Sequence, residues 1–149
     1  MNGVRNVHNV YTTGYEGFEP PQFIEKLVIH GIRTIIDVRE KPLSRKNGFR
    51  KSILYAYLKK NGINYYHLGE LGSPSKIRYK LYADKNYVSF FSSYSRYLNT
   101  QGPTLNKLVK ILETNPVCCL MCFEKDYKLC HRKILSEYLR SLDFEIKHV

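Results

Sequence analysis

Five residues that can do chemistry lie close together near the end of the 149-residue chain, in the triplets Cys122-Phe123-Glu124 and Cys130-His131-Arg132. A thiol can act as a nucleophile, while a carboxyl group and an imidazole can move protons. A guanidinium can bind a phosphate or a carboxylate through two parallel hydrogen bonds. This combination is typical of an active site, so it is the first candidate.

The second triplet is predicted to begin a helix, where unpaired N–H groups favour anions and lower the pKa of a thiol. Three chemistries fit the residues. Cys122 or Cys130 could attack an electrophile while His131 carries the proton. Arg132 could hold a phosphate while Glu124, or Asp37 from an earlier strand, acts as a general base. The sulfur and imidazole groups could also hold a metal ion.

The metal is the weakest of these interpretations, and no metal or other cofactor is predicted. Seven residues separate Cys122 from Cys130, outside the usual short ligand spacing, and the adjacent Cys130 and His131 rarely reach one ion together. A reversible Cys122–Cys130 disulfide fits a strand end beside a helix start. Simple packing is the alternative for both thiols, and Cys118 and Cys119 are expected in the core.

Other polar candidates follow the remaining predicted strands. Asp37 and Arg39 lie two residues apart on one strand, so they share a face and could pair, in which case Asp37 orients Arg39 instead of acting as a base. Tyr15 could stack on a nucleic-acid base, and Glu16 could complement a helix dipole. Three more residues are candidates for binding a ligand: Ser44, Arg45 and Glu70.

Apolar segments of strand length alternate with segments of helical period, in the order βαβαβ, an insertion, then αβαβ. The predicted strands cover residues 7–12, 33–38, 63–68, 117–121 and 144–149. This pattern predicts a three-layer, Rossmann-like α/β sandwich with a mostly parallel five-stranded sheet. Ligands of such sheets bind beyond the carboxyl ends of the strands, so the candidate residues are expected to meet at one edge.

The chain is expected to form one domain, residues 1–149, in which residues 73–102 are a Tyr-rich helical insertion over the sheet edge or the site. Aromatic residues alternate there with basic ones and could hold a single nucleic-acid strand. Five apolar side chains also recur at helical spacing, which favours packing of a lid helix: Tyr87, Phe90, Phe91, Tyr94 and Leu98.

The chain carries a formal charge of +11, and the excess lies in its middle. Residues 39–110 contain fifteen lysines and arginines against three acids, while the rest contains nine against ten. This asymmetry favours a polyanionic partner, although it could also serve solubility. The longest apolar run, residues 117–123, is far shorter than the roughly 18 residues of a membrane span. We expect a soluble, cytoplasmic protein without a membrane partner, and no oligomeric state is predicted.

Taken together, the motifs resemble the family called domain of unknown function 488. The motifs are the segment 11–17, Asp37-Val38-Arg39 with Pro42, Ser44 and Arg45, Glu70-Leu71-Gly72, and Cys122-x-Glu124 followed by Cys130-His131-Arg132. The resemblance covers nearly the whole chain and implies a three-layer α/β fold with a conserved polar site of unestablished chemistry. Thr13, where the family commonly has an aliphatic residue, and the very aromatic insertion depart from the family pattern.

The leading hypothesis is an enzyme, a hydrolase of a phosphate-bearing substrate, which is a nucleotide or a nucleic acid. Arg39, Arg45 and Arg132 would bind the anion, while Glu124 or Asp37 would act as base and a cysteine as nucleophile. A Walker-type NTPase and a standard dinucleotide site are excluded because neither glycine-rich motif occurs. The alternatives are a non-catalytic nucleic-acid-binding module and a thiol redox sensor that uses Cys122 and Cys130.

Overall fold

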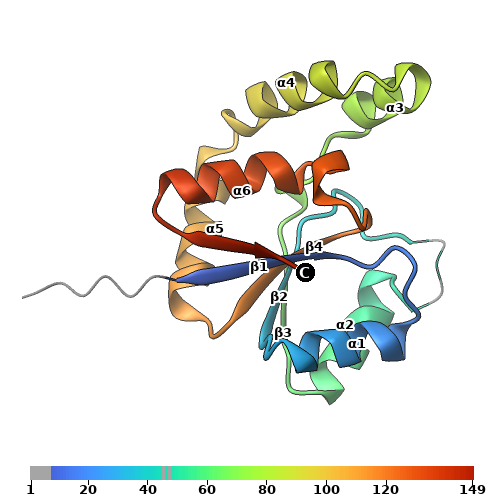
Figure 1. Ribbon diagram of the computed structural model, residues 1–149, viewed down its shortest axis with the longest axis vertical. Helices are drawn as coiled ribbons and strands as arrows, with labels where there is room; N and C mark the ends of the chain where they lie inside the picture. Colours follow the sequence, from blue (N-terminus) through green and yellow to red (C-terminus); the bar gives the residue numbers. More distant parts are fainter. Residues whose placement is uncertain (1–7, 45, 47) are drawn as a thin grey trace, which may run out of the picture.

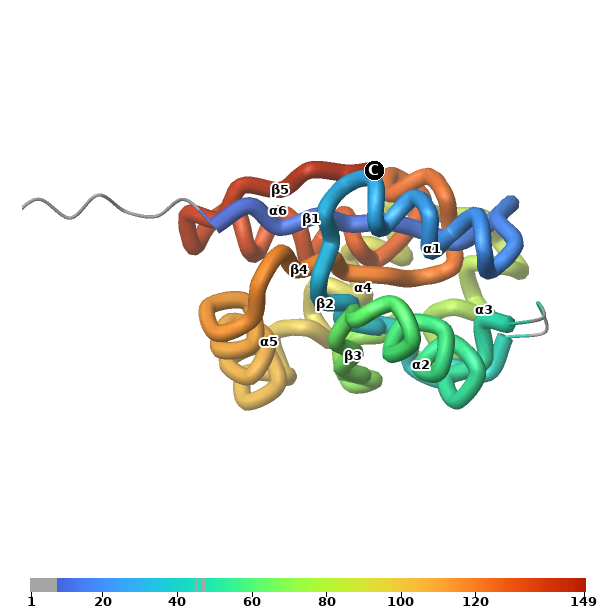
Figure 2. The backbone as a smooth tube through the Cα atoms, turned by 90° about the horizontal axis from the view of Figure 1, so that it is seen from below, coloured from blue at the N-terminus to red at the C-terminus, as the bar shows by residue number. Residues whose placement is uncertain are grey.

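The computed structural model describes residues 8–44, 46 and 48–149, which contain a five-stranded sheet with helices on both faces (Figure 1). The spatial order of the strands is β3-β2-β4-β1-β5, and every neighbouring pair is parallel. Figure 2 shows this order from β5 at the top to β3 at the bottom. The strands are β1 (Asn9–Gly14), β2 (Thr34–Asp37), β3 (Asn64–His67), β4 (Cys118–Cys122) and β5 (Glu145–His148). The predicted Rossmann-like α/β sandwich is confirmed, with a sheet that is parallel throughout.

Two interior strands of the sheet, β2 and β4, are buried on both faces, as is typical of parallel sheets covered by helices. Every residue of β2 and of β4 is buried, whereas β3 and β5 alternate between exposed and half-buried residues at the two edges. Side chains of β4 alternate between the two halves of the core. Leu120 and Cys122 face one hydrophobic cluster, and Cys119 and Met121 face the other.

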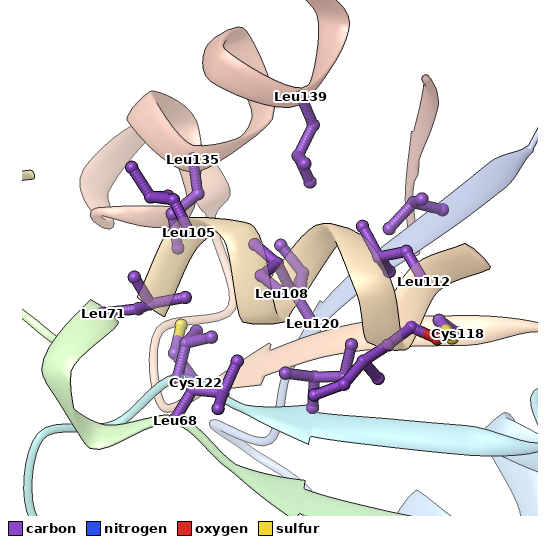
Figure 3. Packing of buried hydrophobic residues seen from close by; sticks show 14 of the residues in the cluster. Leu68, Leu71, Leu105, Leu108, Leu112, Cys118, Leu120, Cys122, Leu135 and Leu139 are labelled. Atoms are coloured by element: carbon purple, nitrogen blue, oxygen red, sulfur yellow. Dashed lines mark hydrogen bonds between the residues drawn. The ribbon is translucent and has the colours of Figure 1, made fainter. Parts of the chain in front are cut away.

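Two helices cover each face of the sheet. The helices α1 (Pro20–Ile29) and α2 (Lys51–Lys60) pack on the side of Cys119 through Phe23, Leu27, Leu54 and Leu58. The opposite face is covered by α5 (Gly102–Thr114) and α6 (Arg132–Ser141), whose leucines surround Leu120 in Figure 3. The buried leucines on that side are Leu105, Leu108, Leu112, Leu135 and Leu139. Each helix therefore buries one apolar stripe against the sheet.

The first strand differs from its predicted bounds. It was expected at residues 7–12, of which residue 7 lies outside the described residues, but β1 begins at Asn9 and continues to Gly14. The reason is its parallel pairing with β4, which ends at Gly14 opposite Cys122. The same pairing extends β4 one residue beyond the predicted end, so Cys122 belongs to the strand itself.

The insertion folds into α3 (Ser75–Asp84) and α4 (Tyr87–Leu98), which lie beyond α6 in Figure 1. The aromatic stripe of α4 serves packing, because Phe90, Tyr94 and Leu98 are buried, while Tyr87 and Phe91 are half-buried. The Tyr94 hydroxyl donates a hydrogen bond of 2.5 Å to the carbonyl of Leu71 in the short 3₁₀ helix Gly69–Leu71. A second 3₁₀ helix, Tyr127–Leu129, precedes α6. Among the described residues, no helix is long and apolar enough to cross a membrane.

Replacing Leu108 with alanine should destabilise the protein, since this side chain of α5 is fully buried against the sheet. We expect the free energy of unfolding to fall by about 3 kcal/mol, from lost burial and the cavity left behind. Denaturation in urea measures it. The control is Val88→Ala in α4, because Val88 is 82% exposed, and this change should hardly alter the free energy of unfolding. Equal losses in both variants would contradict the described core.

Candidate active site

A cleft of about 220 Å³ opens at the carboxyl edge of the sheet, where the topology of a parallel α/β fold leads us to look for a ligand. It lies between the segments that follow β1, β2 and β4, the start of α6, and one side of α3. Its lining residues are Tyr15, Arg39, Glu40, Lys41, Leu43, Ser73, Arg78, Tyr82, Cys122, Phe123, Glu124 and His131.

Two cysteines meet beside this cleft. Cys122 is the last residue of β4 and lines the cleft, and Cys130 directly precedes His131, the N-cap of α6. Their Sγ atoms are 2.8 Å apart, and each residue is 1% exposed. At this separation one thiol donates a hydrogen bond to the other sulfur, and both cannot carry a negative charge at once. The two cysteines form a thiol pair that shares a proton.

Arg132, the first residue of α6, holds the thiol pair in place. Its Nε donates a hydrogen bond of 2.9 Å to Sγ of Cys122, and Nη1 donates one of 2.9 Å to Oγ1 of Thr12. Nη2 donates to the carbonyl of Glu124 at 2.5 Å. All three guanidinium nitrogens thus face protein atoms in a side chain that is 1% exposed. This differs from the predicted role of Arg132 as the residue that binds the substrate anion.

His131 lies on the other side of Cys130. Its Nε2 is 2.8 Å from the carbonyl of Val38, which can only accept, so Nε2 carries a hydrogen. Nδ1 is therefore the nitrogen that faces Sγ of Cys130, at 3.5 Å. Burial lowers the pKa of His131, but the negative charge of Cys130, its hydrogen bond and Glu124 outweigh this and raise it overall. A positively charged imidazole beside Cys130 stabilises a thiolate.

The thiol pair loses its first proton easily and holds the second strongly. Burial opposes ionisation of Cys130, but the hydrogen bond from Cys122 and the charges of His131 and Arg132 bring its pKa well below the usual range. The pKa of Cys122 lies well above the usual range because of burial and of the charge on Cys130. Since the sulfurs are hydrogen-bonded, the single negative charge belongs to the pair.

Glu124 supplies a carboxyl group next to the thiol pair. Its Oε2 is 3.4 Å from Sγ of Cys122, and the side chain lines the cleft. Burial and the negative charge of Cys130 raise the pKa of Glu124, partly offset by His131. A carboxyl group with a raised pKa is suited to donating a proton and then to accepting one.

Gly14 explains how Glu124 reaches this position. A Cβ atom at Gly14 would collide with the backbone of Glu124, so glycine lets the chain after β4 pass directly against the end of β1. Two backbone hydrogen bonds tie these segments together, from Tyr15 N–H to the Cys122 carbonyl at 3.2 Å and from Glu16 N–H to the Phe123 carbonyl at 2.9 Å. The carboxyl ends of β1 and β4 are thereby joined beneath the cleft.

The same group could hold a metal ion. One ligand atom each from Cys122, Glu124 and Cys130 lie within 4.8 Å of one another. Thiolate and carboxylate ligands suit Zn²⁺, for which the two sulfur atoms would have to separate to roughly 3.8 Å. The spacing of the cysteines along the chain does not reveal this cluster, because it forms only where β4 ends beside the start of α6.

Asp37 and Arg39 form a buried ion pair, as the alternative interpretation of their spacing had it. Arg39 donates from Nε to Oδ1 at 2.9 Å and from Nη2 to Oδ2 at 2.7 Å. The Tyr65 hydroxyl also donates to Oδ2, at 2.6 Å. Nη1 of Arg39 donates to the Tyr15 hydroxyl and to the Phe49 carbonyl. Asp37 thus orients Arg39 instead of facing the cleft as a base. Arg39 lines the cleft but is only 8% exposed, so little of its side chain is accessible to a ligand.

The remaining predicted residues lie in different places. Tyr15 lines the cleft, but its ring is stacked on Phe49 at 4.3 Å, so that face cannot stack on a base. Glu16 is exposed and accepts a hydrogen bond from Lys125 N–H at 2.9 Å, outside the cleft lining. Ser44, which accepts a hydrogen bond from Lys46 N–H, and Glu70, which is exposed on its 3₁₀ helix, do not line the cleft, and Arg45 lies outside the described residues.

Among the cleft residues that were not predicted as part of this site are Glu40, Lys41, Arg78 and Tyr82. Glu40 and Lys41 directly follow β2, so their position after a strand was a usable signal. Arg78 and Tyr82 come from α3, which Glu40 anchors by accepting a hydrogen bond from the Ser75 hydroxyl at 2.6 Å. Burial alone would raise the pKa of Glu40, but the hydrogen bonds from Ser75 and the positive charge of Arg78 have a larger effect. The pKa is therefore lowered overall, and the carboxylate stays charged.

The lowered pKa of Cys130 predicts that the thiol pair carries a thiolate at neutral pH, which is lost only as the pH falls through that lowered value. Arg132→Gln removes a positive charge and should raise this pKa by about one unit or more. Arg132→Lys keeps the charge and should shift it less. The ultraviolet absorbance of the thiolate against pH, relative to Cys130→Ser, measures the effect. Arg140→Gln, an exposed arginine of the same helix, should reproduce the wild-type curve. An unchanged curve in Arg132→Gln would contradict the described site.

Asp37→Asn should strongly destabilise the protein, because it leaves the Arg39 guanidinium buried without its counter-charge. We expect a loss of about 3 to 5 kcal/mol in the free energy of unfolding, measured by urea denaturation. The control is Glu137→Gln, which breaks the exposed Lys133–Glu137 ion pair and should cost at most about 1 kcal/mol. Similar losses in both variants would show that the buried pair does not stabilise the sheet edge.

Comparison with protein-family models gives one match, to the family described as domain of unknown function DUF488, over residues 19–139. The matched range includes β2, the cleft residues that follow it, and both cysteine triplets. It begins after the segment 11–17. No curated protein and no solved structure matched the chain. Because the match covers most of the sequence, the chain belongs to the DUF488 family.

Proposed function

We propose that this protein is an enzyme that hydrolyses a phosphate-bearing substrate, a nucleotide or a nucleic acid, in the cleft at the carboxyl edge of the sheet. The observation that carries the proposal is the thiol pair at the cleft wall. Its sulfur atoms are 2.8 Å apart, the Arg132 guanidinium is 2.9 Å from Cys122, and the Glu124 carboxyl is 3.4 Å from the same sulfur. A nucleophile, a positioning cation and a proton donor therefore lie within one hydrogen-bonded group.

The charge of the cleft supports an anionic substrate. Lys41 and Arg78 lie on its lining, together with the exposed edge of Arg39. Of the two acids on the lining, Glu40 accepts a hydrogen bond from Ser75 and forms an ion pair of 3.4 Å with Arg78, and Glu124 stands beside the thiol pair. A phosphate would be held by the exposed Lys41 and the half-buried Arg78, while the buried Arg132 acts on the nucleophile.

In the first step, the shared proton moves from Sγ of Cys122 to Sγ of Cys130, and the Cys122 thiolate attacks the phosphorus atom. The S–P bond forms, the bond from phosphorus to the leaving oxygen breaks, and that oxygen takes the proton of Glu124. In the second step, water attacks phosphorus and gives a proton to the Glu124 carboxylate. The S–P bond then breaks, and the thiolate and the protonated Glu124 are restored.

The thiol pair also favours one alternative, a redox sensor. Hydrogen peroxide could oxidise the two cysteines to a disulfide with release of two water molecules, since their sulfur atoms are already adjacent. This function needs neither Glu124 nor the cations of the cleft. Counting free thiols under mild oxidation tests it: wild type should lose two thiols more than Cys122→Ser, and equal losses would reject the sensor.

The hydrolase is tested with the p-nitrophenyl and phenyl esters of thymidine 5′-phosphate. We expect Cys122→Ser to abolish release of the leaving group. Glu124→Gln should lower kcat by about 100-fold or more for the phenyl ester, whose leaving oxygen needs a proton, and much less for the p-nitrophenyl ester. This leaving-group dependence separates proton donation from a merely structural effect.

Two variants serve as controls in the same assay. Cys118→Ser changes a buried cysteine at the far end of β4, and Glu137→Gln changes an exposed acid of α6. Both should keep wild-type turnover. Activity that survives in Cys122→Ser, or an equal loss for both esters in Glu124→Gln, would refute the proposed roles.

A further inference from the structure

A second cavity, of about 650 Å³, lies beside the edge strand β3 and helix α2. Its walls are aromatic and basic: Tyr55, Tyr65 and Tyr66 form one part, and Arg50 and Lys51 another. Tyr55 is 46% exposed and Tyr66 is 37% exposed, so their rings are accessible from solvent. We name this cavity the tyrosine groove.

The tyrosine groove and the catalytic cleft are neighbouring cavities that share a lining residue. Leu43, in the segment after β2, lines both cavities and is 71% exposed. A chain-like ligand that lies in the groove can therefore pass Leu43 and enter the cleft without leaving the surface. A small ligand confined to the cleft would not need the groove.

The charged side chains that line the groove, Arg50 and Lys51, are both positive. Residues 41–69, which contain α2, β3 and the segment before them, hold seven lysines and arginines and no aspartate or glutamate. The larger cavity beside β5, of about 1150 Å³, is lined by both signs, with Glu113 and Glu145 as well as Arg140 and Lys147. The tyrosine groove thus combines accessible aromatic rings with positive charge that no acid on its lining opposes, which is the chemistry that attracts a polyanion.

We propose that the tyrosine groove binds single-stranded nucleic acid and delivers it to the catalytic cleft. Bases would stack on Tyr55 and Tyr66, while Arg50 and Lys51 contact phosphates. This inference rests on the proposed function and names its substrate class. A single strand is favoured over a duplex because stacking on a protein ring needs the face of an unpaired base.

The far side of the cleft offers the same chemistry. Tyr82 of α3 lines the cleft and is 60% exposed, and Arg78 stands beside it. Tyr79, 63% exposed, has the Arg78 guanidinium 5.8 Å from its ring centre. Aromatic and basic side chains therefore flank the thiol pair on both sides, as expected for a strand that crosses the cleft instead of ending in it.

The test is the binding of a fluorescein-labelled oligothymidylate of about 12 nucleotides, the scale of known single-strand sites, measured by anisotropy over a salt series. We expect wild type to bind with a steep salt dependence. Tyr55→Ala and Tyr66→Ala should each weaken binding about tenfold. Lys51→Gln should reduce the slope of log affinity against log salt by about one.

Matched controls separate the groove from the basic surface in general. Tyr57→Ala changes a tyrosine of the same helix that is 38% exposed but does not line the groove, and should leave the affinity unchanged. Lys107→Gln removes an exposed charge from α5 and should keep the salt slope. Equal binding by Tyr55→Ala and Tyr57→Ala, no binding at low salt, or duplex binding as tight as that of the single strand would overturn the proposal.

Hydrolysis of the thymidine esters distinguishes a failure of the groove from a failure of the proposed function. If wild type cleaves the esters but does not bind the oligonucleotide, the proposed function stands and the groove is refuted. If the oligonucleotide binds through Tyr55 but the esters are not cleaved, the groove is a nucleic-acid site and the hydrolase is refuted.

Discussion

The burial of one cation, Arg132, is the constraint on which the site depends. Its guanidinium joins Cys122 at the end of β4, Thr12 in β1 and the Glu124 carbonyl to the first turn of α6. An arginine removed from water is costly unless a negative charge and hydrogen bonds compensate it. The lowered pKa of Cys130 favours a thiolate, which supplies that charge. The interaction that holds helix and sheet together therefore also keeps a sulfur atom ionised at the cleft.

A second buried arginine, Arg39, also joins separate segments of the chain beside the cleft. Arg39 binds Asp37 through two hydrogen bonds and reaches Tyr15 and Phe49, which belong to the segments after β1 and β2. A guanidinium matched to several protein acceptors has few donors left for a ligand. Recognition of a substrate thus falls to the cations that remain exposed, whereas the buried arginines hold the edge of the sheet in shape.

The strands and helices were predictable because their patterns are local. The apolar run of β4 and the stripe of leucines in α5 can be recognised within a dozen residues, and each lies where its period predicts. The first strand was misplaced by two residues because its end is set by pairing with β4, more than one hundred residues away. Hydrogen bonds between distant segments cannot be recognised from the residue pattern of either segment alone.

By itself, the sequence determined the residue types of the site and their place at one sheet edge, since Cys122 ends β4 and both Glu124 and Arg132 follow it. Only the tertiary structure decided which of them touch. It brought Cys130 to Cys122, turned Arg39 toward Asp37, left Glu16 and Glu70 outside the cleft, and added Arg78 and Tyr82 from the insertion. These contacts depend on the strand order and on how the helices bury their apolar faces. Strand order and helix packing depend on interactions along the whole chain, so no single segment of the sequence determines them.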